Sequence, residues 1–201
     1  MNAKRKWDRT SYFYDLWAAP MEMMGGREWR PMLFSELPGG RILEIGVGTG
    51  VNFEYYPDGA RDYTGIDISP KMLAKARARA DRLGKKIELL EMDAGDLKFP
   101  DNSFDAVFTT CVLCSVPDAI GALREMRRVL KKDGTAIFLE HMRPDKGLLG
   151  IVFDMMNPLT SRLIGFNVNR RTVGHIREAG FGIIEERHLL RDIFRYLKAR
   201  P

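Results

Sequence analysis

A glycine-rich loop between two short apolar segments is the feature that most constrains this chain. The segment 41–50 reads RILEIGVGTG, an apolar run followed by glycine at positions 46, 48 and 50. A second apolar run ends on Asp67, where a carboxylate can accept hydrogen bonds from two ribose hydroxyls. Glycine permits backbone angles and a close ligand approach that side chains would block. This layout is typical of a nucleoside cofactor site at the carboxyl ends of parallel strands.

The rest of the chain alternates between strand-like and helix-like segments, which predicts an α/β fold with a parallel sheet and right-handed crossovers. Ser69 and Pro70 form a helix start, and Gly84 ends that helix. The expected strands are 42–45, 63–67, 87–91, 104–109, 135–140, 181–189 and 192–198. The other expected helices are 7–24, 51–56, 117–130 and 171–179, and Asp133-Gly134 is expected to turn the chain into the fifth strand.

The chain of 201 residues, 45% of them hydrophobic, is expected to form one domain over residues 1–201. Residues 1–40 would form an N-terminal helical lid, separated from the first strand by the break at 38–40. Residues 143–169 are rich in Gly, Met and Leu and contain Pro144 and Pro158 as breaks. We interpret that segment as an insertion near the substrate site.

Charge and cysteine content limit the location and partners of the chain. No run of 18 apolar residues exists and the basic start lacks an apolar signal core, so we expect a cytoplasmic protein. Residues 141–201 hold 11 basic and 6 acidic side chains. This excess of positive charge favours a phosphorylated substrate or a peripheral contact with the inner face of an anionic membrane. No RNA-binding module appears, so no nucleic-acid partner is expected. Cys111 and Cys114 are interpreted as reduced thiols, and no metal is expected because the three histidines are scattered.

The spacing of the glycines decides between cofactors. A dinucleotide fingerprint requires glycine at position 51, which is Val51 here. Glu44 instead lies two residues before the first glycine, where its carboxylate would repel a pyrophosphate but can hold an ammonium. The sequence thus resembles the class I S-adenosylmethionine-dependent methyltransferases, whose first motif reads E/D-x-G-x-G-x-G. The resemblance implies a Rossmann-like doubly wound sheet of seven strands, mostly parallel with the last strand antiparallel, and S-adenosyl-L-methionine as cofactor.

The same resemblance assigns roles to individual residues. Glu44 and the three loop glycines would line the methionine part of the cofactor, and Asp67 would bind the ribose. Adenine would contact apolar side chains and a carboxylate, and the end of the fourth strand would pass beneath the sulfonium. The residues expected to bind the cofactor are Glu44, Gly46, Gly48, Gly50, Asp67, Ile68, Met72, Asp93, Ala94, Thr110 and Cys111. Taken singly, Asp93 also fits a turn cap, Met72 a core residue and Asp67 a helix cap.

Candidate acceptor-side residues follow from their positions. Tyr14 resembles a tyrosine that reaches over the cofactor as a lid, although its helix could also simply pack on the core. His141 directly follows the fifth strand and titrates in the range useful for a general base, so we assign it a catalytic role beside Tyr14. An ordinary surface histidine is the alternative. Arg170 and Arg171 at the start of a helix are expected to bind an acceptor phosphate, or to be solvated.

The acceptor itself stays open between three classes. Segments 41–50 and 67–73 resemble bacterial phospholipid N-methyltransferases, which methylate phosphatidylethanolamine. Segments 112–116, 140–141 and 169–179 resemble the membrane-associated thiol S-methyltransferases of animals. Quinone-ring C-methyltransferases share only the core motifs. We expect an apolar small-molecule or lipid acceptor, with phosphatidylethanolamine as the first choice. A protein that merely binds S-adenosylmethionine is the non-enzyme alternative, and TCVLC at 110–114 argues against an amino-directed base methyltransferase.

Overall fold

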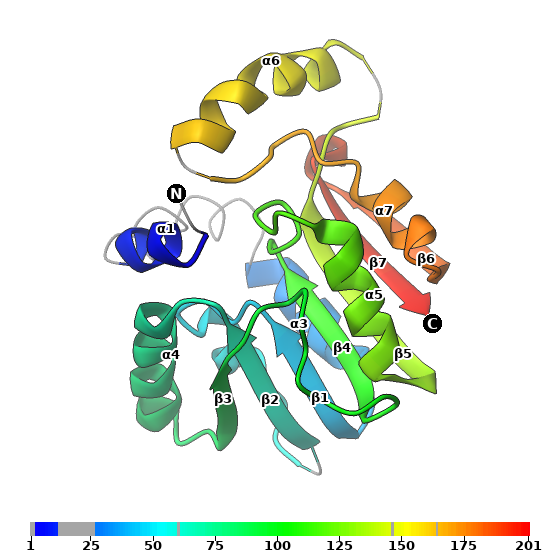
Figure 1. Cartoon of the computed structure of the whole chain (residues 1–201). Helices are drawn as coiled ribbons and strands as arrows, with labels where there is room; N and C mark the ends of the chain where they lie inside the picture. The colour runs from blue at the N-terminus through cyan, green and yellow to red at the C-terminus, as the bar shows by residue number, and fades with distance from the viewer. Residues whose placement is uncertain (1–2, 12–26, 60, 146, 164) are drawn as a thin grey trace.

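A single seven-stranded sheet organises the computed structural model, which describes residues 3–11, 27–59, 61–145, 147–163 and 165–201. The strand order is β3-β2-β1-β4-β5-β7-β6, and all neighbours pair in parallel except those of β7 (Figure 1). Strand β7 pairs antiparallel with β5 and with β6, so the expected Rossmann-like sheet with an antiparallel last strand is confirmed. The strands are β1 (Gly40–Ile45), β2 (Arg61–Asp67), β3 (Ile87–Glu91), β4 (Phe104–Thr110), β5 (Leu130–His141), β6 (Gly182–Leu189) and β7 (Phe194–Arg200).

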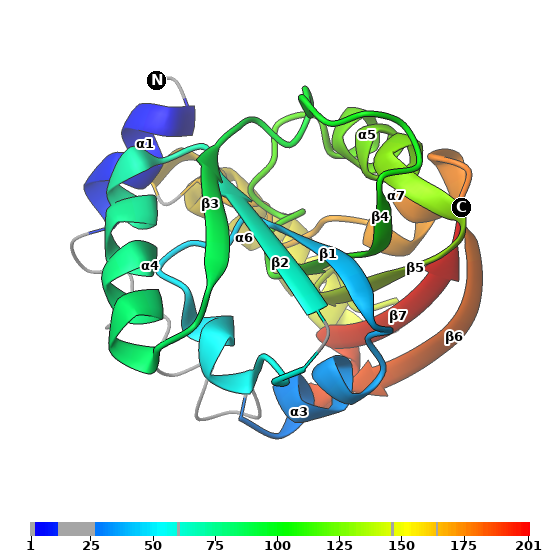
Figure 2. The ribbon, with the colours of Figure 1, turned by 90° about the horizontal axis from the view of Figure 1, so that it is seen from below.

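Helices cover both faces of this sheet (Figure 2). They are α1 (Ala3–Thr10), α3 (Arg27–Ser35), α4 (Pro70–Leu83), α5 (Ala119–Val129), α6 (Leu148–Leu163) and α7 (Thr172–Glu178), with short 3-10 turns η2 (Val51–Tyr55) and η3 (Leu190–Asp192). Apolar side chains of α5 and α7 pack with Phe138 and Leu197 on one face, and those of α3, η2 and α4 pack with Phe108 and Tyr196 on the other. Two buried layers therefore hold the parallel strands rigid, with their carboxyl ends along one edge.

Local signals in the sequence account for the bounds of α4. The Ser69 hydroxyl accepts a hydrogen bond from the Met72 amide, and Pro70 occupies the first turn. Gly84 then adopts a left-handed conformation with φ of 63° and closes the helix. These are the start and end that the sequence predicted, and they place Asp67 and Ser69 at the edge where the strands end.

The structure corrects several expected boundaries. Helix α6 runs through Pro158, so this proline does not break the insertion as expected. Helix α3 was not predicted. Strand β5 already begins at Leu130, and its register against β4 shifts between residues 130 and 135, where the sequence predicted a turn before a separate strand. The expected helix at 7–24 is represented by α1, which starts at Ala3 and ends at Thr10, and residues 12–26 lie outside the described residues.

Candidate active site

A cavity of about 250 Å³ lies at the carboxyl ends of the parallel strands. It is bounded by the ends of β1, β2 and β4, the loops after β1, β2, β3 and β4, the first turn of α4 and one residue of α1. Its lining residues are Trp7, Ile45, Gly46, Gly48, Ile66, Asp67, Ile68, Met72, Met92, Asp93, Ala94, Thr110, Cys111, Val112, Ser115, Val116 and Pro117. Nine of the eleven residues expected to bind the cofactor therefore face one cavity, whereas Glu44 and Gly50 do not belong to this set.

The glycine loop forms the wall of the cavity after β1. Gly46 has φ of 69°, and a Cβ added to it would lie 2.6 Å from a methyl carbon of Val112 in the loop after β4. Both residues line the cavity, and the absent side chain lets Val112 pack directly against the glycine loop. This cradle fits the methionine part of the expected cofactor.

Asp67 ends β2 with its carboxylate held by the backbone. Its Oδ2 accepts a hydrogen bond of 2.9 Å from the Gly48 amide, and its Oδ1 accepts one of 2.8 Å from the Ser69 amide. Burial raises the pKa of this carboxyl, against the lowering effect of those two amides. Each carboxylate oxygen can accept a second hydrogen bond, so the group still has the capacity to bind two hydroxyls.

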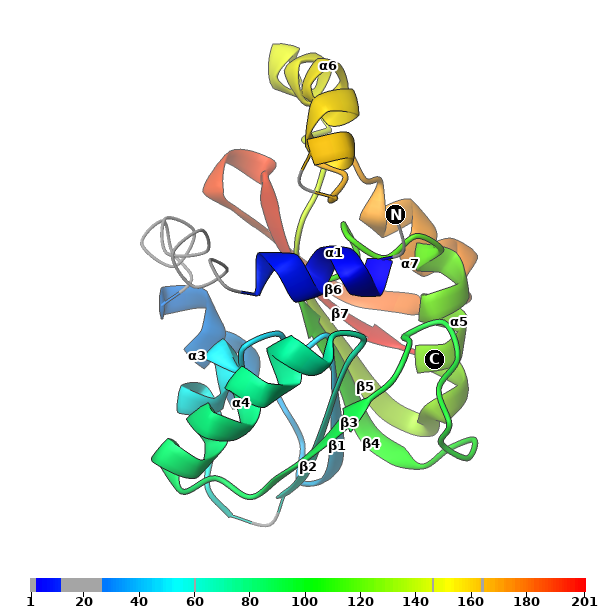
Figure 3. The ribbon, with the colours of Figure 1, turned by 60° about the vertical axis from the view of Figure 1, so that its left-hand side comes forward.

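Helix α1 lies beside α4 (Figure 3), and its Trp7 lines this part of the cavity. Asp8 accepts a 2.6 Å hydrogen bond from the Ser69 hydroxyl, and the backbone carbonyl of Ser11 accepts one from the Lys75 ammonium. These contacts seat Trp7 as a lining residue beside Asp67. The N-terminal segment thus contributes directly to the cavity, as the lid interpretation requires, whereas Tyr14 lies outside the described residues.

A further part of the lining combines apolar side chains with one carboxylate. Ile68 and Met72 line it from the start of α4, and Ala94 lines it from the loop after β3. Asp93 faces the same space while its Oδ1 accepts a 2.9 Å hydrogen bond from the Gly95 amide. The turn-cap and adenine-acceptor roles of Asp93 are therefore compatible in this geometry.

Glu44 lies in a closed network below the cavity. Its carboxylate accepts hydrogen bonds from the Asn52 amide and the Tyr56 hydroxyl, and Arg30 donates to the same Asn52. Burial raises the pKa of Glu44 to about 7, despite these hydrogen bonds and the nearby guanidinium. The Asn52 side chain also donates a 2.9 Å hydrogen bond to Thr110, which lines the cavity. In this structure Glu44 therefore acts on the cavity through Asn52, and its direct contact with an ammonium stays a prediction.

The loop after β4 is held from beneath by Glu140. This fully buried carboxylate accepts hydrogen bonds of 2.6 Å from the Thr109 hydroxyl, 3.0 Å from the Val112 amide and 3.2 Å from the Leu113 amide. Burial raises its pKa to about 7. Cys111 in the same loop has φ of 56°, a strained conformation for a residue with a side chain. Glu140 thus fixes a strained loop that forms one wall of the cavity.

Arg170 holds the same loop from the other side. Its guanidinium donates a 2.7 Å hydrogen bond to the Val116 carbonyl and a longer one of 3.4 Å to the Cys114 carbonyl. Asn167 adds hydrogen bonds to that Cys114 carbonyl from its backbone and side-chain amides. Arg170 is therefore engaged by the protein and does not line the cavity, which differs from the expected open phosphate contact. Arg171 is exposed next to it, at the start of α7.

His141 at the end of β5 lies between aromatic rings. The centres of the Phe166 and Phe194 rings are 5.7 Å and 6.0 Å from that of His141. Burial lowers the pKa of His141 to about 4, so the expectation that it titrates near neutral pH is not met in this structure. It does not belong to the residues that line the cavity. A role as a general base stays a prediction, with neutral imidazole as the form present at pH 7.

Sequence reasoning missed the residues that support the site from a distance. Arg30, Asn52 and Tyr56 were not predicted because the sequence does not show which helix packs beside Glu44. In the segment Leu139-Glu140-His141, the sequence pattern indicates a role for the histidine and does not predict that the glutamate supports the site. An apolar strand that ends in a buried acid could have signalled it, since a carboxylate in a core needs several donors.

Comparisons with known proteins agree with this geometry. Residues 43–138 match a family model described as "Methyltransferase domain". The chain is 41% identical over 116 residues to a phosphatidylethanolamine N-methyltransferase of Cereibacter sphaeroides, covering 57% of each chain. It is 34% identical over 171 residues to a human thiol S-methyltransferase, covering 78% of this chain and 69% of that one. The chain thus spans little more than half the length of the first of these relatives.

A solved structure shows the same fold. The crystal structure of a protein of Thermotoga maritima, described as a SAM-dependent methyltransferase and possible histamine N-methyltransferase, superposes with a TM-score of 0.73 over 99% of both chains. Only 21% of the residues are identical, so this likeness concerns the fold alone. Among the described residues, no group of histidine, cysteine, aspartate and glutamate side chains is arranged to hold a metal ion.

Proposed function

Because the chain belongs to the S-adenosylmethionine-dependent methyltransferases, we propose that it transfers a methyl group to the amine of phosphatidylethanolamine. Membership of the family confirms the resemblance inferred from the sequence and makes S-adenosyl-L-methionine the cofactor. The single observation that carries the proposal is the cavity at the carboxyl ends of the strands, where the Gly46–Gly48 loop and Asp67 face each other. Similarity to the phosphatidylethanolamine enzyme supports the choice of acceptor.

The residues of this chain are suited to hold the cofactor in one orientation. Asp67 would accept hydrogen bonds from the ribose hydroxyls, and Asp93 would accept one from the adenine amino group. The loop after β4 would support the sulfonium end of the cofactor. When bound, the sulfonium supplies an already activated methyl group. The task left to the protein is alignment and exclusion of water. Glu140 and Arg170 serve alignment, because Glu140 holds the loop after β4 at Val112 and Arg170 holds it at Val116.

The acceptor amine must lose its proton before it attacks. Neutral His141 has a free lone pair at pH 7, but a pKa of about 4 makes it a weak base in this structure. Tyr14 is the other candidate, and its role as a lid and proton acceptor is part of the proposal. Arg171 is exposed beside the same loop and is the arginine better placed than Arg170 to meet an acceptor phosphate.

Location at a membrane surface belongs to the same proposal. A phospholipid acceptor is presented by a bilayer, and the excess of basic side chains in residues 141–201 favours an anionic surface. Within the described residues, no helix has the length and hydropathy needed to cross a bilayer. We therefore propose peripheral contact from the cytoplasmic side.

Methyl transfer to the sulfur of a thiol is the second candidate. The human thiol S-methyltransferase is similar over a longer segment than the phosphatidylethanolamine enzyme, 171 against 116 residues. A thiol has a pKa of about 8.5 and supplies its own nucleophile at mildly alkaline pH, so it needs no strong base in the protein. The low pKa of His141 favours this alternative, and quinone-ring C-methylation remains a third class.

Turnover of S-adenosylmethionine labelled in its methyl group tests the proposal. The purified chain is incubated with vesicles that contain phosphatidylethanolamine, and the label in lipid is counted. Vesicles of phosphatidylcholine are the matched control, because their amine carries three methyl groups already. Label in phosphatidylethanolamine alone supports the proposal. Label only in a small alkyl thiol, or only in a demethylated quinol, would replace it with the corresponding alternative.

A further inference from the structure

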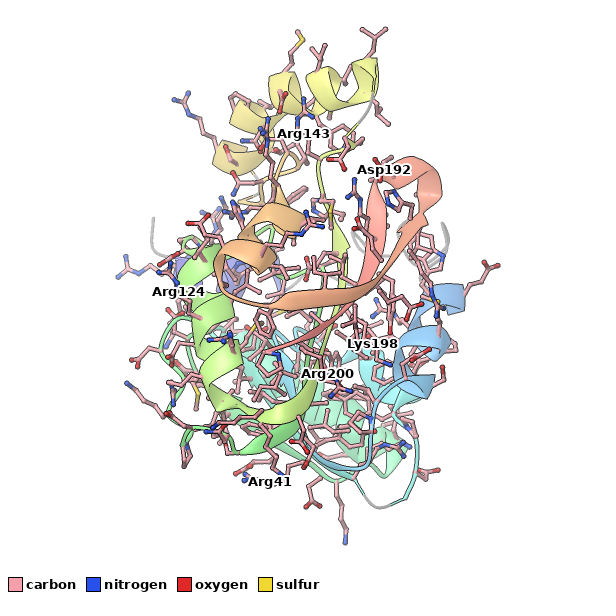
Figure 4. All side chains as sticks on the ribbon, turned by 90° about the vertical axis from the view of Figure 1, so that its right-hand side faces the viewer. Arg41, Arg124, Arg143, Asp192, Lys198 and Arg200 are labelled. Carbon is pink, nitrogen blue, oxygen red and sulfur yellow. The ribbon has the colours of Figure 1, made fainter. Side chains whose placement is uncertain are left out.

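Helix α6 exposes most of its apolar side chains. Nine large hydrophobic side chains are exposed in the described part of the chain, and seven of them lie on this helix. Leu148 and Met155 are 79% and 77% exposed, and Leu159 is 63% exposed. Single exposed apolar residues are common, but a contiguous group of this size marks an interaction surface. The helix projects beyond the body of the protein, as Figures 1 and 4 show.

The exposed residues form one face of the helix. Leu148, Val152, Met155 and Leu159 follow one another at intervals of four, three and four residues. With about 3.6 residues per turn, this spacing places them in a single stripe. Ile151 and Met156 flank the stripe and are also exposed. We call these six residues the apolar stripe.

The opposite face of α6 carries polar side chains that are bonded to the rest of the protein. Asp154 is held by Arg143, whose guanidinium donates bonds of 2.8 to 3.1 Å to both carboxylate oxygens. Figure 4 shows Arg143 at the foot of the helix. Asn157 donates to Asn167, in the segment that also holds the loop after β4. A helix on the surface of a protein in water normally buries its apolar face, and α6 is oriented the other way round.

Exposed positive charge lies at the last turn of α6 and on the adjoining helix α1. Arg162 lies in the last turn of α6, and α1 presents Arg5 and Arg9. All three are exposed and form no ion pair with the residues that the structure describes. Helix α1 is attached to α6 by a 3.1 Å hydrogen bond from the Lys6 ammonium to the Ser161 carbonyl. An apolar stripe with a cationic border is complementary to an anionic lipid surface.

We propose that the apolar stripe of α6 inserts into the surface of an anionic bilayer, with the arginines of α1 and α6 at the level of the phosphates. Two copies of the chain would bring like charges together along the same border, which disfavours self-association through this face. Insertion turns the carboxyl ends of the strands, which carry the cavity, toward the bilayer (Figure 1). The inference rests on the proposed function, because a lipid acceptor gives this orientation its use.

Binding to vesicles, measured without cofactor, tests the insertion. The full chain is sedimented with vesicles of 30% phosphatidylglycerol in phosphatidylcholine and with vesicles of phosphatidylcholine alone. The test variant is the double substitution Leu148→Ser with Met155→Ser. The matched control is Ile184→Ser on β6, which removes a side chain that is 57% exposed but lies outside α6. Circular dichroism verifies that both variants fold, as expected for exposed positions.

The native chain and the control should bind the anionic vesicles, more weakly at 1 M salt. The double variant should lose about 10-fold or more in partition coefficient, since two large apolar side chains no longer insert. Equal binding by the double variant and the control would overturn the inference. So would a native chain that ignores the vesicles and sediments as a dimer, with the double variant monomeric, because the stripe would then be covered by a second copy.

A second measurement separates this inference from the proposed function. Methyl transfer is followed with dihexanoyl phosphatidylethanolamine, kept below the concentration at which it forms micelles. The double variant should keep its turnover on this dissolved acceptor and lose turnover only on vesicles. A different outcome is that neither the native chain nor a variant methylates the amine, while only the double variant loses vesicle binding. In that case the proposed acceptor is wrong and the proposed membrane contact is retained.

Discussion

Glu140 affects the stability of the fold in two ways, as a hydrogen-bond acceptor for the loop after β4 and as a buried group that can ionise. Replacement of Glu140 by glutamine separates these two effects. The carboxylate accepts hydrogen bonds from Thr109, Val112 and Leu113, and burial raises its pKa from 4.5 to about 7. Glutamine has nearly the same shape but carries one oxygen in place of two. One of the two backbone amides therefore loses its acceptor at every pH, which costs about 1–3 kcal/mol.

The charge effect has the opposite sign and depends on pH. Between pH 4.5 and 7 the folded chain binds more protons at Glu140 than the unfolded chain does. The contribution of this residue to the free energy of unfolding is therefore greatest below pH 4.5 and falls as pH rises through 7. At about 1.4 kcal/mol per pH unit, the loss between pH 5 and pH 8 is about 2–3 kcal/mol. Glu140→Gln cannot ionise and escapes this loss.

Urea denaturation followed by circular dichroism at pH 5, 6.5 and 8 measures both effects. At pH 5 the variant should be less stable than the native chain by about 1–3 kcal/mol. By pH 8 this deficit should have shrunk or reversed, by about 2–3 kcal/mol. Other titrating groups are the same in both proteins and cancel in the difference. Glu178→Gln, at an exposed position of α7, controls for the change in net charge.

A stability difference that is the same at pH 5 and pH 8 would refute the reasoning, because Glu140 would then ionise alike in the folded and unfolded chains. The same variant has a functional readout. If Glu140 positions the wall formed by Cys111 and Val112, calorimetry should show weaker binding of S-adenosylmethionine even at pH 8, where the stability of the fold is restored. Undiminished affinity would show that the loop keeps its shape without this acceptor.

Three further predictions concern the cavity and its surroundings. Asp67→Asn should weaken binding of S-adenosylmethionine by about 10-fold or more, because charge-assisted hydrogen bonds to the ribose are lost, and unchanged affinity in calorimetry would remove Asp67 from the site. Gly46→Ala should abolish cofactor binding, because the added Cβ would meet Val112. Gly84→Ala is the control, since Gly84 has a similar positive φ but open space around it. This control should lower the free energy of unfolding by only about 1–2 kcal/mol in thermal unfolding and leave the affinity for the cofactor intact. If His141 is the general base, turnover should fall as the pH decreases through its pKa of about 4. A decrease of turnover near pH 6.5 that disappears in His141→Gln would show that acceptor binding restores the ordinary pKa of this imidazole.

The order of elements and the position of the cofactor site could be predicted from the sequence because both depend on local chemistry. Apolar runs, glycines at positions 46 and 48 and the Ser69-Pro70 helix start each act on a few neighbouring residues. Parallel strands then bring their ends together whatever the details of packing, so Asp67 and Asp93 were expected at one edge and both line the cavity.

Helix α6 shows where local signals fail. Pro158 removes a hydrogen bond within the helix, so the sequence predicted a break there. The helix persists, with Asp154 held by Arg143, which precedes the helix, and Asn157 held by Asn167, which follows it. Its apolar stripe was visible as a Met- and Leu-rich segment, but only the structure shows that the stripe faces away from the protein.

By itself, the sequence determined the fold, the family and the cofactor, since these follow from short motifs in a fixed order. Only the tertiary structure decided the state of the buried polar groups. Glu44 and His141 were assigned to direct contacts with ligands, yet one is enclosed by Asn52 and Tyr56 and the other is desolvated between aromatic rings. The donors and rings come from elements far apart in the chain, and the ionisation of an acid or an imidazole depends on which of them packing brings within reach.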